Sequence, residues 1–193
     1  TVREVLRHRD VERCVLVEID ELVVSASRRF IPQTAAALSD KRAHVLIQDG
    51  VKYVAQTQER FDVVIVDSTE PFGPAKELFG PAFYKNVRRI LTKDGIVVSQ
   101  AGSPFYELKT ITNLFKIMRP IFPVVEACLF TNLTYPGGLW AFTFASKGLH
   151  PIDNFKPQRV KASKISLRWY NADIHSGAFS LPSFLRTAIG RGA

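Results

Sequence analysis

The chain has 193 residues, of which 46% are apolar and 23% are charged, a composition typical of a globular protein with a substantial core. No apolar run approaches the roughly 18–20 residues that a membrane-spanning helix needs. The first residues show no basic and apolar leader with a cleavage site, so we expect a cytoplasmic protein. Cys14 and Cys128 lie in apolar stretches without metal-ligand spacing. We therefore expect buried, reduced thiols and no metal site.

The formal net charge of +8 raises the question of a nucleic-acid partner. Residues 1–147 account for +3 of it and residues 148–193 for +5. The basic side chains of the second segment are spread singly, without a dense run or a known nucleic-acid motif. Solvated faces explain such charges, so we expect neither nucleic acid nor a membrane as a partner.

Apolar runs of strand length alternate with segments of helical period in the first part of the chain. This alternation predicts an α/β protein with a largely parallel sheet. We expect helices over 1–8, from about 21 to Phe30 and from 51 towards 57, with Pro32 ending the second of them. Strands are expected over 14–20 and 43–48, and the unbroken apolar body of the first suits burial on both faces.

The segment 62–67, Asp-Val-Val-Ile-Val-Asp, is the clearest strand of the sequence. A loop over 68–80 follows it, and Pro81 suits the first turn of a helix that continues through Leu91. The next predicted elements are a strand over 95–100 and an amphipathic helix over 108–118 that Pro120 ends.

Two further apolar runs, 124–132 and 139–147, leave no room for a helix between them. We expect them to pair antiparallel at the edge of the sheet. Residues 148–163 are polar and contain proline, as in a linker, and Ser180 is a candidate N-cap for a last helix with Phe184, Leu185 and Ile189. This organisation predicts a catalytic domain over 1–147 and a C-terminal extension over 148–193 that packs on the same domain.

Acidic residues follow three of the predicted parallel strands: Glu18 with Asp20, then Asp49, then Asp67 with Glu70. In an open α/β sheet, ligands bind outside the carboxyl ends of the strands, so these acids are expected to meet at one crevice. Glu18 is placed to hold the hydroxyls of a ribose, and Asp49 with Gly50 to read the edge of an adenine. A single strand-end acid is often a turn former or a helix cap. Three on successive strands favour a binding site.

Asp67 combines a rigid strand with a following loop of about a dozen residues, a length that usually marks a lid or a binding segment. A buried carboxylate without a partner would be costly, and a cation would offset that cost. The sequence offers no obvious basic partner for Asp67. A cationic substrate is therefore a reasonable candidate.

The loop Asp67-Ser-Thr-Glu-Pro-Phe-Gly-Pro-Ala-Lys-Glu-Leu-Phe79 resembles the signature loop of the spermidine synthases, a family of polyamine aminopropyltransferases. Val17-Glu-Ile-Asp20, Asp49-Gly50 and Thr134-Tyr-Pro-Gly-Gly-Leu-Trp140 are similar to further segments of that family. Arg168-Trp-Tyr-Asn-Ala-Asp-Ile-His175 and Ala178-Phe-Ser-Leu-Pro182 resemble its C-terminal stretch. The resemblance covers essentially the whole chain in the right order.

The resemblance implies roles for particular residues. Asp67 would be the catalytic base. Glu18 would bind the ribose of decarboxylated S-adenosylmethionine, and Asp49, Gly50 and Pro74 would line its nucleoside pocket. The diamine putrescine would be held by Asp67, Ser68, Thr69, Glu70 and Tyr135. Many family members carry Asp where this chain has Glu70, so the contact with the far amine would differ in length.

The resemblance also implies a Rossmann-like fold of the S-adenosylmethionine-dependent methyltransferase type, acting as a homodimer or homotetramer. Decarboxylated S-adenosylmethionine would be a co-substrate, and no prosthetic group is expected. Family members carry a small N-terminal β domain, a central strand and a glycine-rich loop before the position where this sequence starts. Strands 14–20 and 62–67 would flank that central strand, so we expect these 193 residues alone to fold poorly and to be weakly active or inactive.

Two alternatives stay open at this point. A putrescine-type N-methyltransferase would share the fold and most of these residues, because only the transferred group changes. A non-catalytic homologue would serve as a binding or assembly module, although it would tend to lose the charges of Glu18, Asp49 and Asp67.

Overall fold

The computed structural model describes residues 1–68 and 73–191, which form two compact units. The first unit comprises Thr1–Thr57 and Lys161–Ser166, and the second comprises Gln58–Val160 and Leu167–Ala193. Each unit is described by itself below. The expected division into 1–147 and 148–193 stays a prediction.

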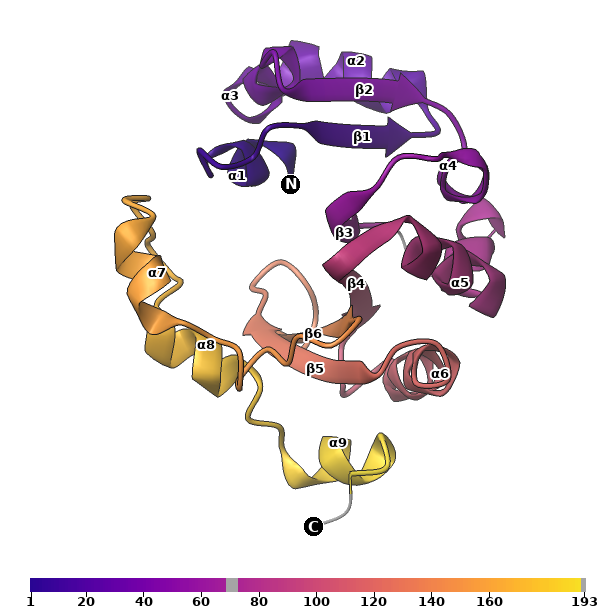
Figure 1. Ribbon diagram of the computed structural model, residues 1–193, viewed down its shortest axis with the longest axis vertical. Coiled ribbons are helices and arrows are strands. Elements are labelled where there is room, and N and C mark those ends of the chain that lie inside the picture. The colour runs from indigo at the N-terminus through magenta and orange to yellow at the C-terminus, as the bar shows by residue number, and fades with distance from the viewer. Residues whose placement is uncertain (69–72, 192–193) are drawn as a thin grey trace. The chain divides into compact units, whose positions relative to one another are not determined.

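The first unit is built on two parallel strands, β1 (Cys14–Glu18) and β2 (Ala43–Ile47), whose arrows point the same way in Figure 1. Their register runs from Cys14 opposite Ala43 to Glu18 opposite Ile47, so the two carboxyl ends coincide. The helices of this unit are α1 (Val2–Leu6), α2 (Glu21–Phe30), α3 (Pro32–Ala35), the 3₁₀ helix η1 (Ala36–Ser39) and α4 (Gly50–Gln56). The strands and main helices predicted from the sequence of this part are all present.

Arg42 fastens the end of α1 to the start of β2. Its guanidinium donates to the carbonyl oxygens of Leu6 (2.8 Å), His8 (3.2 Å) and Val11 (3.2 Å), and it also pairs with the Asp40 carboxylate at 2.9 Å. Hydrogen bonds from Arg42 lower the pKa of Asp40 to about 2. One side chain thus binds the carbonyl of the last residue of α1 and two carbonyls beyond it, where intrahelical partners are lacking.

The second unit contains a sheet with the strand order β3 (Phe61–Val66), β4 (Leu91–Gly102), β6 (Leu139–Ser146) and β5 (Val124–Thr131). β3 and β4 are parallel, whereas β6 is antiparallel to both β4 and β5, which confirms the predicted antiparallel pair. β4 begins at Leu91, earlier than expected, because Phe61 of β3 pairs with Leu91 before an irregularity in the register.

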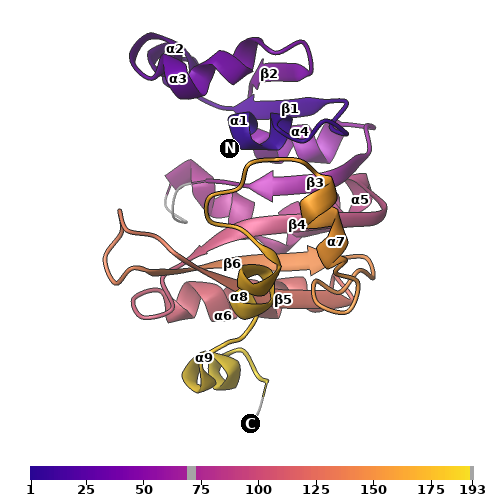
Figure 2. The same cartoon turned by 90° about the vertical axis from the view of Figure 1, so that its left-hand side faces the viewer.

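Helices cover both faces of this four-stranded sheet. Figures 1 and 2 show α5 (Pro81–Ile90) and α6 (Leu108–Met118) on one face and α8 (Ala172–Ala178) on the other. Pro81 occupies the first turn of α5, as predicted, and the helix buries Phe83, Tyr84, Val87 and Ile90. The hydroxyl of Tyr84, a fully buried residue, donates to Ser99 Oγ on β4 at 3.1 Å. Burial raises the pKa of Tyr84 to about 12.

The C-terminal segment differs from the expectation in two respects. The last helix, α9 (Ser183–Ala188), follows Pro182 rather than Ser180, and no side chain caps it. Ser180 instead donates from its hydroxyl to the carbonyl of Ser176, because it follows the end of α8. The sequence reading also missed α8, which Asn171 caps by accepting from Ile174 N at 2.8 Å, and α7 (Pro157–Ala162).

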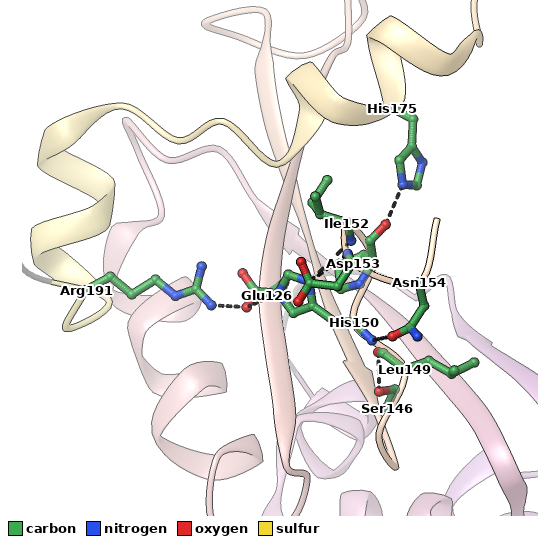
Figure 3. A network of polar contacts seen from close by, with 10 residues as sticks. Glu126, Ser146, Leu149, His150, Ile152, Asp153, Asn154, His175 and Arg191 are labelled. Carbon is green, nitrogen blue, oxygen red and sulfur yellow. Dashed lines mark hydrogen bonds and ion pairs between the residues drawn. The ribbon is translucent and has the colours of Figure 1, made fainter. Parts of the chain in front are cut away.

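A polar network anchors this segment to the outer strand β5 (Figure 3). Glu126 of β5 is buried, with 6% of its side chain exposed, and pairs with the guanidinium of Arg191 beyond α9. The Nε2 atom of His150 lies 3.4 Å from the same carboxylate oxygen. His175 of α8 bonds the carbonyl of Pro151 through Nε2 at 2.8 Å. A buried charge is thereby paired. Leu185 of α9 and Ile189, which follows the helix, are both buried in the core.

The described strands form two separate sheets: β1 pairs with β2, and β3 pairs with β4. Within residues 1–68 and 73–191, no strand is paired with the second edge of β1 or of β3. The further strand expected between segments 14–20 and 62–67 stays a prediction.

Candidate active site

The first unit places Glu18 and Asp49 at the same edge of its sheet, because β1 and β2 are parallel and in register. Glu18 is half-buried, and its Oε1 accepts a hydrogen bond from Asp20 N at 2.9 Å. Its main-chain carbonyl accepts from Gln48 N at 2.9 Å, which extends the pairing to the residue before Asp49. Both acids thus lie at the edge of this unit's sheet where the sequence analysis expected them.

Asp49 is the N-cap of α4, and Gly50 is the first residue of that helix. The Oδ1 atom of Asp49 accepts from Val51 N at 2.8 Å and from Lys52 N at 3.4 Å. Asp49 thus caps the helix, one of the two roles that its sequence position allowed. Capping uses Oδ1 alone, and Oδ2 accepts no hydrogen bond from any residue that the structure describes.

Asp67 directly follows β3, whose last residue, Val66, is buried and lies opposite Ser99 of β4. Asp67 itself is exposed, so the expectation that this carboxylate is buried was wrong. The alternation along β3 explains this, because Ile65 and Asp67 share the more exposed face and Val66 faces inward. Binding of a cationic substrate by Asp67 stays a prediction.

The loop after Asp67 is described in part. Ser68 is half-buried, whereas Thr69 and Glu70 lie outside the described residues, so their predicted roles stay predictions. Residues Gly73–Phe79 form a 3₁₀ helix, η2, that contains Pro74. The side chain of Pro74 lies outside the described part of the chain.

Tyr135 lies in the hairpin loop 132–138, which joins β5 to β6. Its ring packs on the ring of Trp140, with centroids 4.5 Å apart and planes tilted by 38°. Trp140 is 5% exposed, whereas Tyr135 is 50% exposed. A buried aromatic residue thus supports one face of a solvent-accessible phenol.

The carboxyl end of the β3–β4 pair and the start of β6 lie along one edge of the second sheet. Val66 is opposite Ser99, Gln100 is opposite Phe142, and Gly102 is opposite Ala141. Since neighbouring strands are about 4.8 Å apart, Val66 of β3 and Thr143 of β6, which both lie opposite Ser99, are about 10 Å apart across β4. Asp67, Gln100 and Trp140 therefore border the same edge. Sequence reasoning did not single out Gln100 or Trp140, although both sit at strand ends.

The structure describes the three predicted acids in two separate units. Glu18 and Asp49 belong to the first unit, and Asp67 belongs to the second, together with Tyr135. Their convergence on one crevice stays a prediction.

Two findings apply to the described part of the chain as a whole. Among residues 1–68 and 73–191, no group of three or more His, Cys, Asp or Glu side chains is arranged to hold a metal ion. The described helices are also all too short or too polar to cross a membrane. Cys14 and Cys128 are free thiols, and burial raises the pKa of Cys128 to about 11.

Comparison with known proteins identifies the family. Residues 1–156 match the family described as the spermine/spermidine synthase domain. The chain belongs to this family. It is 43% identical to the polyamine aminopropyltransferase of Caldicellulosiruptor saccharolyticus over 188 residues and 46% identical to that of Thermoanaerobacter sp. strain X514 over 189 residues. These matches cover 97% and 96% of the chain and 66% of each relative.

Solved structures agree with the fold. The chain is similar to the crystal structure of spermidine synthase from Thermotoga maritima, with a TM-score of 0.93, 37% identity, and coverage of 98% of the chain and 64% of that structure. A spermidine synthase in complex with the transition state analogue AdoDATO gives a TM-score of 0.95 at 37% identity, covering 98% and 65%. The predicted α/β fold, mostly parallel with an antiparallel part, is confirmed. The chain spans about 66% of the length of the curated relatives it matches.

Proposed function

We propose that this protein is a polyamine aminopropyltransferase of the spermidine synthase type, which transfers the aminopropyl group of decarboxylated S-adenosylmethionine to putrescine. The observation that carries the proposal is the position of Asp67, an exposed carboxylate fixed at the end of β3, in a chain of this family. The relatives named as aminopropyltransferases and the structure with a bound transition state analogue support it.

The predicted residues would serve two subsites, one for the nucleoside and one for the amine. Glu18 and Asp49 of the first unit would hold the ribose and the adenine of the nucleoside, with Asp49 Oδ2 and the main chain at Gly50 facing the base. Asp67, Ser68 and Tyr135 of the second unit would hold the amine, with Thr69 and Glu70 extending that subsite. Pro74 would border the nucleoside. The third of the relatives' length that the chain does not cover would supply further contacts.

The proposed chemistry is a nucleophilic substitution at carbon. The lone pair of a putrescine nitrogen attacks the aminopropyl carbon bonded to the sulfonium sulfur. The C–N bond forms as the C–S bond breaks, the bonding pair returns to sulfur, and methylthioadenosine leaves as a neutral thioether. Putrescine is an ammonium at neutral pH, so its lone pair is exposed when Asp67 accepts a proton from the attacking nitrogen and passes it to solvent. The product nitrogen is then a secondary ammonium.

The free-energy cost of deprotonating the amine is of the size that a single carboxylate base can offset. An alkyl ammonium group resembles lysine, with a pKa near 10.4, so exposing its lone pair at pH 7 costs about 4–5 kcal/mol. A positioned general base typically contributes about 10²–10⁴-fold to the rate, which is about 3–5 kcal/mol. Alignment of the nitrogen with the carbon must provide much of the remaining acceleration.

Both substrates are cations, although the chain carries a net charge of +8. The local field at a site decides attraction, not the net charge of the protein. A pair of unit charges 4 Å apart interacts by about 4 kcal/mol at an effective dielectric constant of 20. Acidic side chains at the strand ends are therefore sufficient to attract an amine and a sulfonium.

The full-length protein tests this proposal directly. We expect it to release methylthioadenosine from decarboxylated S-adenosylmethionine when putrescine is present, and to leave ordinary S-adenosylmethionine unreacted. Methylation of putrescine by ordinary S-adenosylmethionine would identify an N-methyltransferase instead. A protein that turns over neither sulfonium and binds no methylthioadenosine in calorimetry would be a non-catalytic homologue. Cytoplasmic location and assembly into a dimer or tetramer remain parts of the proposal for gel filtration and cell fractionation to test.

A further inference from the structure

The loop that follows β4 is closed on itself and presents two aromatic side chains outward. Ser103 is 1% exposed, and its main-chain carbonyl accepts from Glu107 N at 2.8 Å and from Tyr106 N at 3.3 Å. The carboxylate of Glu107 folds back under the turn, where Oε2 accepts from Ser103 N at 3.0 Å. A Cβ atom on Gly102, which has φ +90°, would meet this Oε2 at 1.5 Å. The base of the turn is therefore fixed, while Phe105 and Tyr106 are exposed.

Tyr106 lies against the neighbouring hairpin loop 132–138, at Gly137. A Cβ atom built on Gly137 would be 2.8 Å from Cε2 of Tyr106, closer than real Cβ contacts allow. The ring thus fills the space that any side chain at position 137 would take. Gly137 also has φ +84°, and the adjacent Gly138 has φ +65° but meets nothing within 4 Å of an added Cβ.

The hairpin loop that receives Tyr106 carries Tyr135. Internal bonds hold its shape: Asn132 N donates to Gly138 O at 2.8 Å, and Gly138 N donates to Tyr135 O at 3.3 Å. The Tyr135 ring rests on Trp140, so one side of the loop is supported from the sheet. Tyr106 contacts the other part of the loop, two residues after Tyr135.

We propose that Tyr106 is a positioning residue for the amine subsite: its ring, seated on Gly137, holds the hairpin loop so that Tyr135 faces the amine. Gly137 is then a glycine because a side chain there would displace the ring. This inference rests on the proposed function, since it assigns Tyr135 to the amine. It predicts that Tyr106 acts on amine binding and leaves the nucleoside subsite of the first unit unchanged.

Single substitutions in the full-length protein separate this role from a general one. We expect Tyr106→Ala to raise the KM for putrescine about tenfold, since small displacements of a positioning group have effects of this order or larger. The kcat and the KM for decarboxylated S-adenosylmethionine should change less than about threefold, as when binding common to the ground and transition states is lost. Tyr106→Phe keeps the ring and should behave as wild type. Phe105→Ala removes the neighbouring exposed aromatic, which stacks instead on Phe184, and should also behave as wild type.

A double-mutant cycle tests the contact itself. Gly137→Ala should raise the KM for putrescine in the wild-type background and have a smaller effect in the Tyr106→Ala background, because the clash is then absent. Gly138→Ala also places a side chain on a residue of positive φ but without a clash, so its effect should be equal in both backgrounds. Additive effects of Gly137→Ala and Tyr106→Ala, or an unchanged amine KM in Tyr106→Ala, would overturn the inference. Absence of aminopropyl transfer by the wild-type protein would instead refute the proposed function.

Discussion

Replacement of Asp67 by Asn is the most informative single substitution for the proposed chemistry. The change keeps the size and removes the charge of a side chain that is exposed and follows β3. The fold should therefore be preserved. If Asp67 takes the proton of the attacking amine, its loss should lower kcat/KM for putrescine by about 10²–10⁴-fold, or about 3–5 kcal/mol of transition-state stabilisation.

The pH dependence identifies the reason for that loss. The fraction of unprotonated amine in solution rises about tenfold per pH unit below the amine's pKa near 10.4. A variant that lacks the base depends on this fraction, so the ratio of wild-type to Asp67→Asn rates should shrink as the pH rises from 7 towards 9.

Asp62→Asn provides a matched control. Asp62 lies near the other end of the same strand, where its Oδ1 accepts from Thr92 Oγ1 at 2.9 Å. The Asp62→Asn variant also removes one carboxylate charge. It should leave the rate of methylthioadenosine release within about twofold of wild type, because an exposed charge at the far end of the strand contributes little to the site. An Asp67→Asn defect below tenfold, equal to that of Asp62→Asn, or constant with pH, would refute the role of Asp67 as base.

Three further predictions concern the scaffold. Tyr84→Phe should make the free energy of unfolding less sensitive to alkaline pH. Because burial raises the pKa of Tyr84 to about 12, the stability that its protonated form contributes is present below about pH 10 and falls by about 2–3 kcal/mol as the pH rises towards 12. Urea titrations of both proteins at pH 8 and 11 would detect the difference. Arg191→Met should lower the free energy of unfolding by about 3 kcal/mol, because it leaves the buried carboxylate of Glu126 without its guanidinium partner. Glu126→Gln should lower it by only about 1 kcal/mol, because the guanidinium left behind is partly exposed. Equal urea midpoints for the two variants would contradict this. Arg42→Met should lower the urea midpoint, since the carbonyls of Leu6, His8 and Val11 lose their bonds from its guanidinium. Arg3→Met, at an exposed pair with Glu4, should leave the midpoint unchanged.

Most of the elements could be predicted from local patterns. Pro81 marked the first turn of α5, the repeat of Leu108, Ile111, Phe115 and Met118 marked α6, and the two apolar runs without an intervening helix marked the antiparallel pair β5 and β6. These signals are local because burial of one helical face or one strand requires a matching period in the sequence.

The errors arose where tertiary contacts decide the local structure. The start of β4 includes Thr92, Lys93 and Asp94, a polar run that reads as a turn, yet pairing of Leu91 with Phe61 brings it into the strand. Ser180 seemed a suitable cap, but α8 already ends beside it and the next helix starts after Pro182. Propensity alone does not resolve such competition between neighbouring elements.

In the candidate site, too, features set by local sequence patterns could be predicted and features set by tertiary contacts could not. The side-by-side placement of Glu18 and Asp49 follows from two parallel strands in register, which the sequence pattern was sufficient to predict. The exposure of Asp67 depends on which face of β3 is covered, and the contact of Tyr106 with Gly137 joins residues far apart in the chain. Neither leaves a periodic signal in the sequence.

The fate of a labelled aminopropyl chain tests the central claim most directly. The full-length protein would be incubated with putrescine and decarboxylated S-adenosylmethionine that carries a heavy isotope in the aminopropyl carbons, and the amine product would be weighed by mass spectrometry. The account predicts labelled spermidine together with unlabelled methylthioadenosine in equal amounts. Label that stays with the nucleoside, or an amine that gains a methyl group, would contradict it.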